Sequence, residues 1–132
     1  MDNISKLREA NEEFNKMKES YRDKISESFV KVIVEHLALT DNLTQVHWTQ
    51  YTPYFNDGDT CYFRVNFDLY YIEEWCEDND IELTDNDRSI INLIEEVVNS
   101  VDDEMMMLLF GDHSKVTITK EGDVTIDHYE HD

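Results

Sequence analysis

The stretch Val46–Phe67, VHWTQYTPYFNDGDTCYFRVNF, decides how the rest of the chain can fold. It holds one of the two tryptophans, three of the six phenylalanines and the only proline. Residues 61–67 alternate between apolar and polar side chains, and this period of two predicts a β-strand with one apolar face. Residues 46–51 alternate more weakly in the same way. The stretch therefore predicts a long β-hairpin that forms one wall of the core.

The connection between these strands contains the turn-forming run Asn56–Asp59, in which glycine takes positive φ and Asn or Asp bond the local backbone. Pro53 cannot donate to a sheet ladder, so we expect strand pairing to stop near Tyr51. This leaves an aromatic loop that includes Tyr51, Tyr54 and Phe55. The loop either folds back to cap the core or offers its rings as a contact surface.

The run Trp48–Asp59, WTQYTPYFNDGD, resembles a segment of small uncharacterised phage and bacterial proteins. It covers about a tenth of the chain. The resemblance implies a phage or mobile-element origin, and it implies no activity, fold or functional residue.

Length and composition predict a single domain over residues 1–132, because 132 residues with 40% apolar side chains can bury a core. No apolar run approaches the length of a membrane span, and the charged start MDNISKLRE is not typical of a signal peptide. We therefore expect a cytoplasmic protein without membrane contact, in the host cytoplasm if a phage encodes it. Cys61 and Cys76 have no metal-type spacing, and we expect reduced thiols.

Charge is distributed unevenly along the chain, which has a formal net charge of −20. Residues 1–39 carry seven basic and eight acidic side chains, whereas residues 40–132 carry four basic and 23 acidic ones. Within the second part, residues 68–104 contain 14 acids and a single base, Arg88. A nearly neutral arm joined to an acidic body suggests two surfaces with different roles.

A helix is predicted over residues 3–38, because apolar residues recur every three or four positions from Ile4 to Val32 and nothing interrupts them. Its first half has a narrow apolar seam that includes Asn11, as in a coiled coil or a helix at a domain edge. Its second half, residues 29–39, is apolar on most sides and should be buried. Residues 1–25 therefore either pack on the same chain or project as an arm that forms a homodimer.

The remaining elements complete an α+β fold in which a central helix packs on a sheet of two antiparallel hairpins. Residues 69–76 fit a helix, with a continuation of the preceding strand as the alternative. A central helix of about 25 residues should begin after the capping box at Thr84 and Asp87 and end at Gly111. A second hairpin is predicted over residues 115–127. Residues 128–132 should form a polar tail.

Tests for chemistry find no catalytic or metal-binding pattern. The segment from Asp78 begins like a calcium-binding EF-hand loop, but Leu83 stands where glycine is needed and Ser89 where glutamate is needed. The histidines have no metal-type spacing, and no nucleophile or phosphate-binding signature occurs. We therefore expect a protein that is not an enzyme and has no metal and no cofactor.

Direct nucleic-acid binding is disfavoured, because phosphate contacts require lysine and arginine and the acidic body would repel a polyanion. The same charge can instead occupy a basic groove meant for nucleic acid. The expected contact residues, called here the acidic cluster, are Glu73, Glu74, Glu77, Asp78, Asp80, Glu82, Asp85 and Asp87.

Three functions follow from these patterns. The first is a nucleic-acid mimic that inhibits a host or defence protein by covering its basic surface, against the alternative that the cluster is only a solvated face. The second is an adaptor that oligomerises through the first helix and makes contact through the aromatic loop. The third is a small-ligand binder that holds its ligand between Trp48, Tyr51, Tyr54 and the acidic rim.

Overall fold

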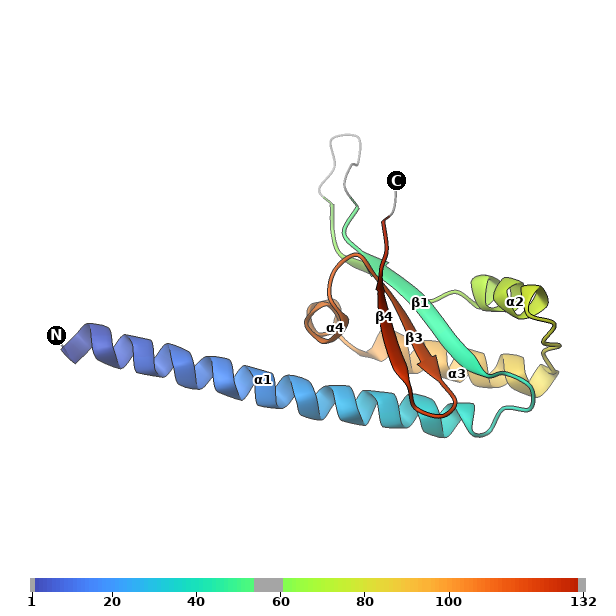
Figure 1. Cartoon of the computed structure of the whole chain (residues 1–132), viewed down its shortest axis with the longest axis horizontal. Coiled ribbons are helices and arrows are strands. Elements are labelled where there is room, and N and C mark those ends of the chain that lie inside the picture. The colour runs from blue at the N-terminus through green and yellow to red at the C-terminus, as the bar shows by residue number, and fades with distance from the viewer. Residues whose placement is uncertain (1, 54–60, 131–132) are drawn as a thin grey trace.

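The computed structural model describes residues 2–53 and 61–130, and in this part the chain is an α+β protein with one antiparallel sheet (Figure 1). The elements in chain order are α1 (Asp2–Leu37), β1 (Gln45–Tyr51), β2 (Arg64–Asn66), α2 (Leu69–Asp78), α3 (Asp85–Ser100), α4 (Asp103–Phe110), β3 (Ser114–Thr119) and β4 (Val124–His128). Among these helices, none has both the length and the apolar composition that a bilayer span requires.

The predicted N-terminal helix is confirmed as α1, a continuous helix of 36 residues. Only its C-terminal part enters the core, through Phe29, Ile33 and Leu37, which are spaced four residues apart and so share one face. The N-terminal half extends away from the rest of the chain (Figure 1). The prediction that residues 29–39 are buried on most sides was too broad, because Leu39 is 64% exposed.

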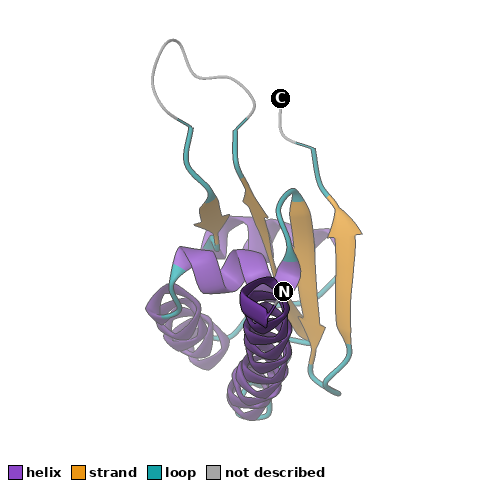
Figure 2. Ribbon diagram, turned by 90° about the vertical axis from the view of Figure 1, so that its left-hand side faces the viewer, coloured by secondary structure: helices purple, strands orange, loops and turns teal. Residues whose placement is uncertain are grey.

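The four strands lie in the order β2-β1-β3-β4, and every neighbouring pair is antiparallel. The two predicted hairpins are therefore joined through β1 and β3, in which Trp48 lies opposite Val116. Figure 2 looks along α1 and shows the strands standing beside the helices. This order places the first strand of the chain in the middle of the sheet.

The two faces of β1 have different environments. On one face Val46, Trp48 and Gln50 are buried, and the Trp48 ring packs against Phe29, Phe67 and Phe110. This is the core face, covered by α1, α3 and α4. The residues that alternate with them, His47, Thr49 and Tyr51, point to the opposite face, called here the outer face.

The prediction of one central helix is wrong in one respect, because two helices, α3 and α4, occupy this segment. Val101 takes an extended conformation with φ −89° and ψ 133°, and α4 restarts when the Asp102 carboxylate accepts the backbone N–H of Glu104. Aspartate favours such caps over helix interiors, so Asp102 and Asp103 disrupt an otherwise continuous apolar pattern. The predicted capping box at Thr84 and Asp87 is confirmed, as is the stop at Gly111, where φ is +88°.

Two strand predictions also need correction. The second strand of the first hairpin was predicted over residues 61–67, but β2 covers only three residues. The C-terminal tail was predicted from residue 128, but His128 belongs to β4, and the backbone N–H of Tyr129 donates to the His113 carbonyl at 2.7 Å. Pairing of β1 ends at Tyr51, as Pro53 predicted. The predicted turn at 56–59 lies outside the described residues.

Candidate functional site

The acidic cluster lies at the end of α2, in the following turn and at the start of α3. Six of its carboxylates are on exposed residues: Glu74, Glu77, Asp78, Asp80, Glu82 and Asp85. Glu73 is half-buried and its carboxylate is 2.9 Å from the guanidinium of Arg88, which also lies 3.7 Å from Asp85. Arg88 is the single base of residues 68–104 and is thus already engaged. Among the described residues, no other ion pair neutralises the exposed carboxylates within 4 Å.

Asp87 was predicted to belong to this surface, but it is fully buried. Its carboxylate accepts backbone N–H groups of Asp41 at 2.6 Å, of Asn42 at 3.2 Å and of Thr84 at 3.1 Å. Burial by itself would raise the pKa of this carboxyl, but these hydrogen bonds together outweigh burial and hold the pKa below its ordinary value. Asp87 therefore joins α3 to the turn after α1 and is not available to a partner.

The predicted aromatic contact residues separate into different environments. Trp48 is 1% exposed and its indole N–H donates to Gln50 Oε1 at 3.0 Å, so it is a core residue. Tyr51 lies on the outer face, half-buried, with its ring 5.6 Å from that of Tyr129. Tyr54 lies outside the described residues.

A groove of about 770 Å³ lies on the outer face of the sheet, between β1 and α2. Because β2 pairs only with the end of β1, the first half of β1 has no strand on that side, and α2 lies beside it (Figure 1). The Trp75 ring is 5.8 Å from that of His47 and fixes this contact. The groove is lined by residues that include His47, Tyr51, Asn66, Asp68, Tyr71, Glu74, Trp75, Asp78, Lys115 and Tyr129.

Helix α2 divides its residues between core and groove by their spacing. Ile72 and Cys76 are four residues apart and reach the core. Tyr71, Glu74 and Asp78 follow at intervals of three and four on an adjacent face and line the groove. The two cluster residues Glu74 and Asp78 therefore face an aromatic groove, whereas Glu77 does not line it.

Two polar groups of the groove are buried without a hydrogen-bond partner in the described part of the chain: Nδ1 of His47 and Nδ2 of Asn66. Such an unsatisfied group costs about 1–3 kcal/mol of stability. His47 is 9% exposed, and burial, with a smaller contribution from the charge of Lys115, lowers its pKa from 6.5 to about 4. The imidazole is consequently neutral near pH 7 and can accept a hydrogen bond through one nitrogen.

The tyrosines of the groove are close enough to affect one another. Burial, followed by the influence of Tyr51 and Tyr71, raises the pKa of the Tyr129 hydroxyl above 10.0. Three rings from β1, α2 and the C-terminal segment therefore converge. Of these rings only Tyr51 was predicted from the sequence, because Tyr71 and Tyr129 lie on α2 and after β4 and become its neighbours only in the folded chain.

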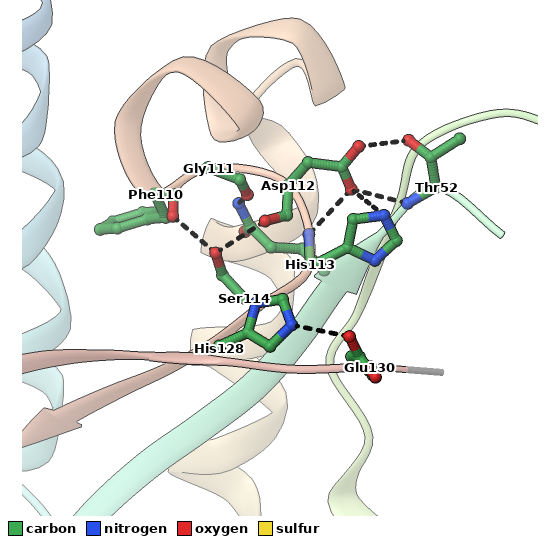
Figure 3. A network of polar contacts seen from close by, with 9 residues as sticks. Thr52, Phe110, Gly111, Asp112, His113, Ser114, His128 and Glu130 are labelled. Carbon is green, nitrogen blue, oxygen red and sulfur yellow. Dashed lines mark hydrogen bonds and ion pairs between the residues drawn. The ribbon is translucent and has the colours of Figure 1, made fainter. Parts of the chain in front are cut away.

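The segment that leaves the groove at Thr52 is anchored by Asp112, which precedes β3 (Figure 3). The Asp112 carboxylate accepts the Thr52 backbone N–H at 2.7 Å, the Thr52 hydroxyl at 2.8 Å and the His113 backbone N–H at 2.8 Å. Ser114 donates its hydroxyl to the Phe110 carbonyl at 2.9 Å. These contacts hold the end of β1 against the turn between α4 and β3.

Metal ligands and cysteine thiols are the side chains that could supply chemistry beyond binding. In residues 2–53 and 61–130, no three His, Cys, Asp or Glu side chains are arranged to hold a metal ion. Burial, with the charges of Asp87 and Glu73, raises the pKa of the buried Cys76 thiol, which lowers its fraction of reactive thiolate. The features that these residues present are exposed carboxylates and an aromatic groove, both of which suit binding.

Comparison of the chain with known protein families, with curated proteins and with solved structures finds no match.

Proposed function

We propose that this protein is a non-enzymatic interaction protein that inhibits a host or defence protein by occupying its nucleic-acid-binding surface. The observation that supports the proposal is the row of exposed carboxylates on α2 and the turn after it, with Arg88 engaged by Glu73. No base of this segment remains to neutralise them. The surface can therefore attract a basic groove from a distance.

The density of charge on α2 is comparable to that of a nucleic acid. Glu74, Glu77 and Asp78 lie within five residues, so this part of the helix carries about one negative charge per 2.5 Å of axis. Duplex DNA carries about one per 1.7 Å. Lysines and arginines that neutralise phosphates can be neutralised by such a surface in the same way.

A reversal of charge tests this proposal. The variant Glu77→Lys/Glu82→Lys/Asp85→Lys changes three exposed carboxylates that do not line the groove. The matched control Glu9→Lys/Glu12→Lys/Glu19→Lys has the same net charge but carries its changes on exposed residues of α1. The tagged wild-type protein is used to capture partners from host lysate, and elution by salt and by duplex DNA is compared.

The proposal expects a captured nucleic-acid-binding protein that is released by salt and displaced by DNA. It expects the first variant to lose this partner and the control to retain it. If DNA does not displace the captured protein, or if both variants capture it equally, the acidic cluster is only a solvated surface and the proposal is wrong.

A second candidate function is an oligomerising module, favoured by the exposed apolar residues of α1. Leu7 is 71% exposed and Phe14 is 61% exposed, although both lie on the seam that leads into the core at Phe29. The occupant that we propose for this seam is a second copy of the chain. The α1 arm is nearly neutral, whereas the two acidic bodies repel each other, so self-association is least opposed through the arm.

The third prediction, a small-ligand site between Trp48, Tyr51 and Tyr54, cannot include the Trp48 ring, because this ring is in the core.

A further inference from the structure

We infer that the outer groove between β1 and α2 binds an arginine side chain presented by a peptide or protein partner. The inference concerns a site on the outer face and does not depend on nucleic-acid mimicry. It rests on three properties of the groove, namely its rings, the position of its carboxylates and its buried unpaired nitrogen atoms.

The rings provide the first argument. Tyr51, Tyr71, Trp75 and Tyr129 come from three parts of the chain and line the same groove. Tyr51 and Tyr129 have ring centroids 5.6 Å apart. The negative faces of aromatic rings attract cations, and the flat guanidinium group also stacks on them.

The carboxylates provide the second argument. Glu74 and Asp78 lie one helical turn apart on the groove side of α2 and have no ion pair among the described residues. Asp68 also lines the groove, but its carboxylate caps α2 by accepting the Tyr70 N–H at 2.8 Å. Opposite them is one cation, Lys115, so the charge of the lining favours a positive ligand. A phosphate would face the carboxylates at close range.

The buried nitrogens provide the third argument, which the acidic residues alone would not supply. His47 lies under Trp75, is 9% exposed, and its Nδ1 has no partner in the described residues. Asn66 lies on the neighbouring strand and also has an unpaired buried nitrogen. A purely apolar ligand would leave both groups unsatisfied. The N–H groups of an arginine can donate to Nδ1 of the neutral imidazole, and a backbone carbonyl of the same peptide can accept the N–H of Asn66 Nδ2.

Arginine fits these features better than lysine. Its five N–H donors lie in one plane, so a single group can stack on a ring, form paired bonds to a carboxylate and donate to a neutral nitrogen. The ammonium group of lysine is more strongly hydrated and cannot stack. The groove volume of about 770 Å³ also leaves room for the peptide backbone on either side of the arginine.

The experiment uses three peptides, acetyl-Gly-Arg-Gly-amide and its lysine and citrulline counterparts, titrated into the full chain. Citrulline has nearly the shape of arginine without its charge. Binding is followed by NMR through the two indole N–H resonances. The Trp75 ring lies over His47 in the groove, so its indole resonance should shift. Trp48 also borders the groove, but its ring is 1% exposed and its indole N–H is bonded to Gln50 on the core face, so its resonance should shift much less.

The expected result is binding of the arginine peptide at about 1 mM, weaker binding of lysine and no shift with citrulline. Glu74→Gln/Asp78→Asn should weaken arginine binding at least about tenfold. Glu77→Gln/Glu82→Gln removes the same charge outside the groove and should leave binding within about threefold. Equal shifts with arginine and citrulline, equal effects of the two double variants, or no Trp75 shift would overturn the inference.

The two proposals fail separately, because the charge reversal that tests mimicry uses residues outside the groove. If the protein binds arginine in the groove but captures no nucleic-acid-binding partner, the groove inference stands and the mimicry proposal fails.

Discussion

The carboxylate of Asp87, at the start of α3, accepts the backbone N–H of Asp41 at 2.6 Å across 46 residues of sequence. The same carboxylate caps its own helix through Thr84. One buried carboxylate therefore accepts backbone N–H groups both from the turn after α1 and from the beginning of α3. This contact orients the acidic turn that precedes α3 relative to the sheet.

Asp87→Asn should destabilise the protein by about 3 kcal/mol, because an amide cannot accept all three backbone N–H groups and brings a donor of its own. Urea denaturation at pH 7 measures the loss. The control is Asp85→Asn, two residues away on an exposed side chain, which should change stability by less than about 0.5 kcal/mol. Equal losses would show that the Asp87 contacts contribute nothing specific.

The pH dependence of that loss has a defined sign. The pKa of Asp87 is lowered in the folded state, so its contribution is complete above its ordinary value of 3.8 and is lost as pH falls through the folded pKa. The stability difference between wild type and Asp87→Asn should therefore be full at pH 7 and shrink below about pH 4.

Gln50 is a buried polar residue with all its contacts inside the core. Its Oε1 accepts the Trp48 indole N–H, and its Nε2 donates to the carbonyls of Met106 at 2.9 Å and Gly111 at 2.7 Å. Gln50→Leu removes the acceptor of the Trp48 indole N–H and the amide bonds to the two carbonyls, and we expect a loss of about 3 kcal/mol in thermal or urea unfolding.

A double-mutant cycle separates this network from simple packing. Trp48→Phe removes the indole donor as well as part of the ring, and its cost should be smaller by about 1 kcal/mol in the Gln50→Leu background. Additive effects of the two changes would mean that the indole and the amide do not stabilise each other.

How far the sequence predicted the structure depended on whether the signal was local. The long helix, the capping box at Thr84 and the hairpin of β3 and β4 have all their determinants within a few neighbouring residues, and they were predicted. The division at Val101 was missed because an apolar period continues across it, and only two aspartates mark the restart.

The candidate site illustrates the same limit. The charge pattern predicted the acidic cluster, but the capping box already indicated that the Asp87 carboxylate is engaged by the backbone of Thr84. The groove joins His47, Trp75, Lys115 and Tyr129, which are distant in sequence and meet through the pairing of β1 with β3 and the contact of α2 with β1. No periodic pattern within one segment could have predicted that meeting.

His47 should titrate near pH 4 and remain neutral at pH 7, because burial first and Lys115 second lower its pKa from 6.5. NMR of the imidazole resonances measures the midpoint. Since the folded pKa lies below the unfolded one, the contribution of His47 is complete above pH 6.5 and falls by about 3 kcal/mol as pH decreases to about 4.

The control for the pH dependence of stability is His47→Gln. As pH falls from 6.5 to 5, this variant should lose less stability than the wild-type protein does. Lys115→Gln should raise the His47 midpoint only in part, because burial remains. A midpoint near 6.5 in the folded protein would contradict a buried, neutral His47 in the groove.

Self-association through α1 gives the last prediction. Five large apolar side chains of the arm are exposed by 54–71%: Ile4, Leu7, Phe14, Met17 and Tyr21. Leu7→Glu/Phe14→Glu should convert a dimer to a monomer in sedimentation equilibrium, because it puts charge into the apolar seam. Ser5→Glu/Ser20→Glu adds the same charge on the opposite side of the helix and should leave the dimer intact.

Salt distinguishes this contact from binding to a basic partner. The acidic bodies of two copies repel each other, so raising ionic strength should strengthen self-association through the arm, whereas it should weaken any complex of the acidic cluster with a basic groove. A wild-type monomer at all salt concentrations, or a dimer that survives Leu7→Glu/Phe14→Glu, would remove α1 as the interface. A dimer that dissociates in salt would instead point to a contact between the arm of one copy and the acidic body of the other.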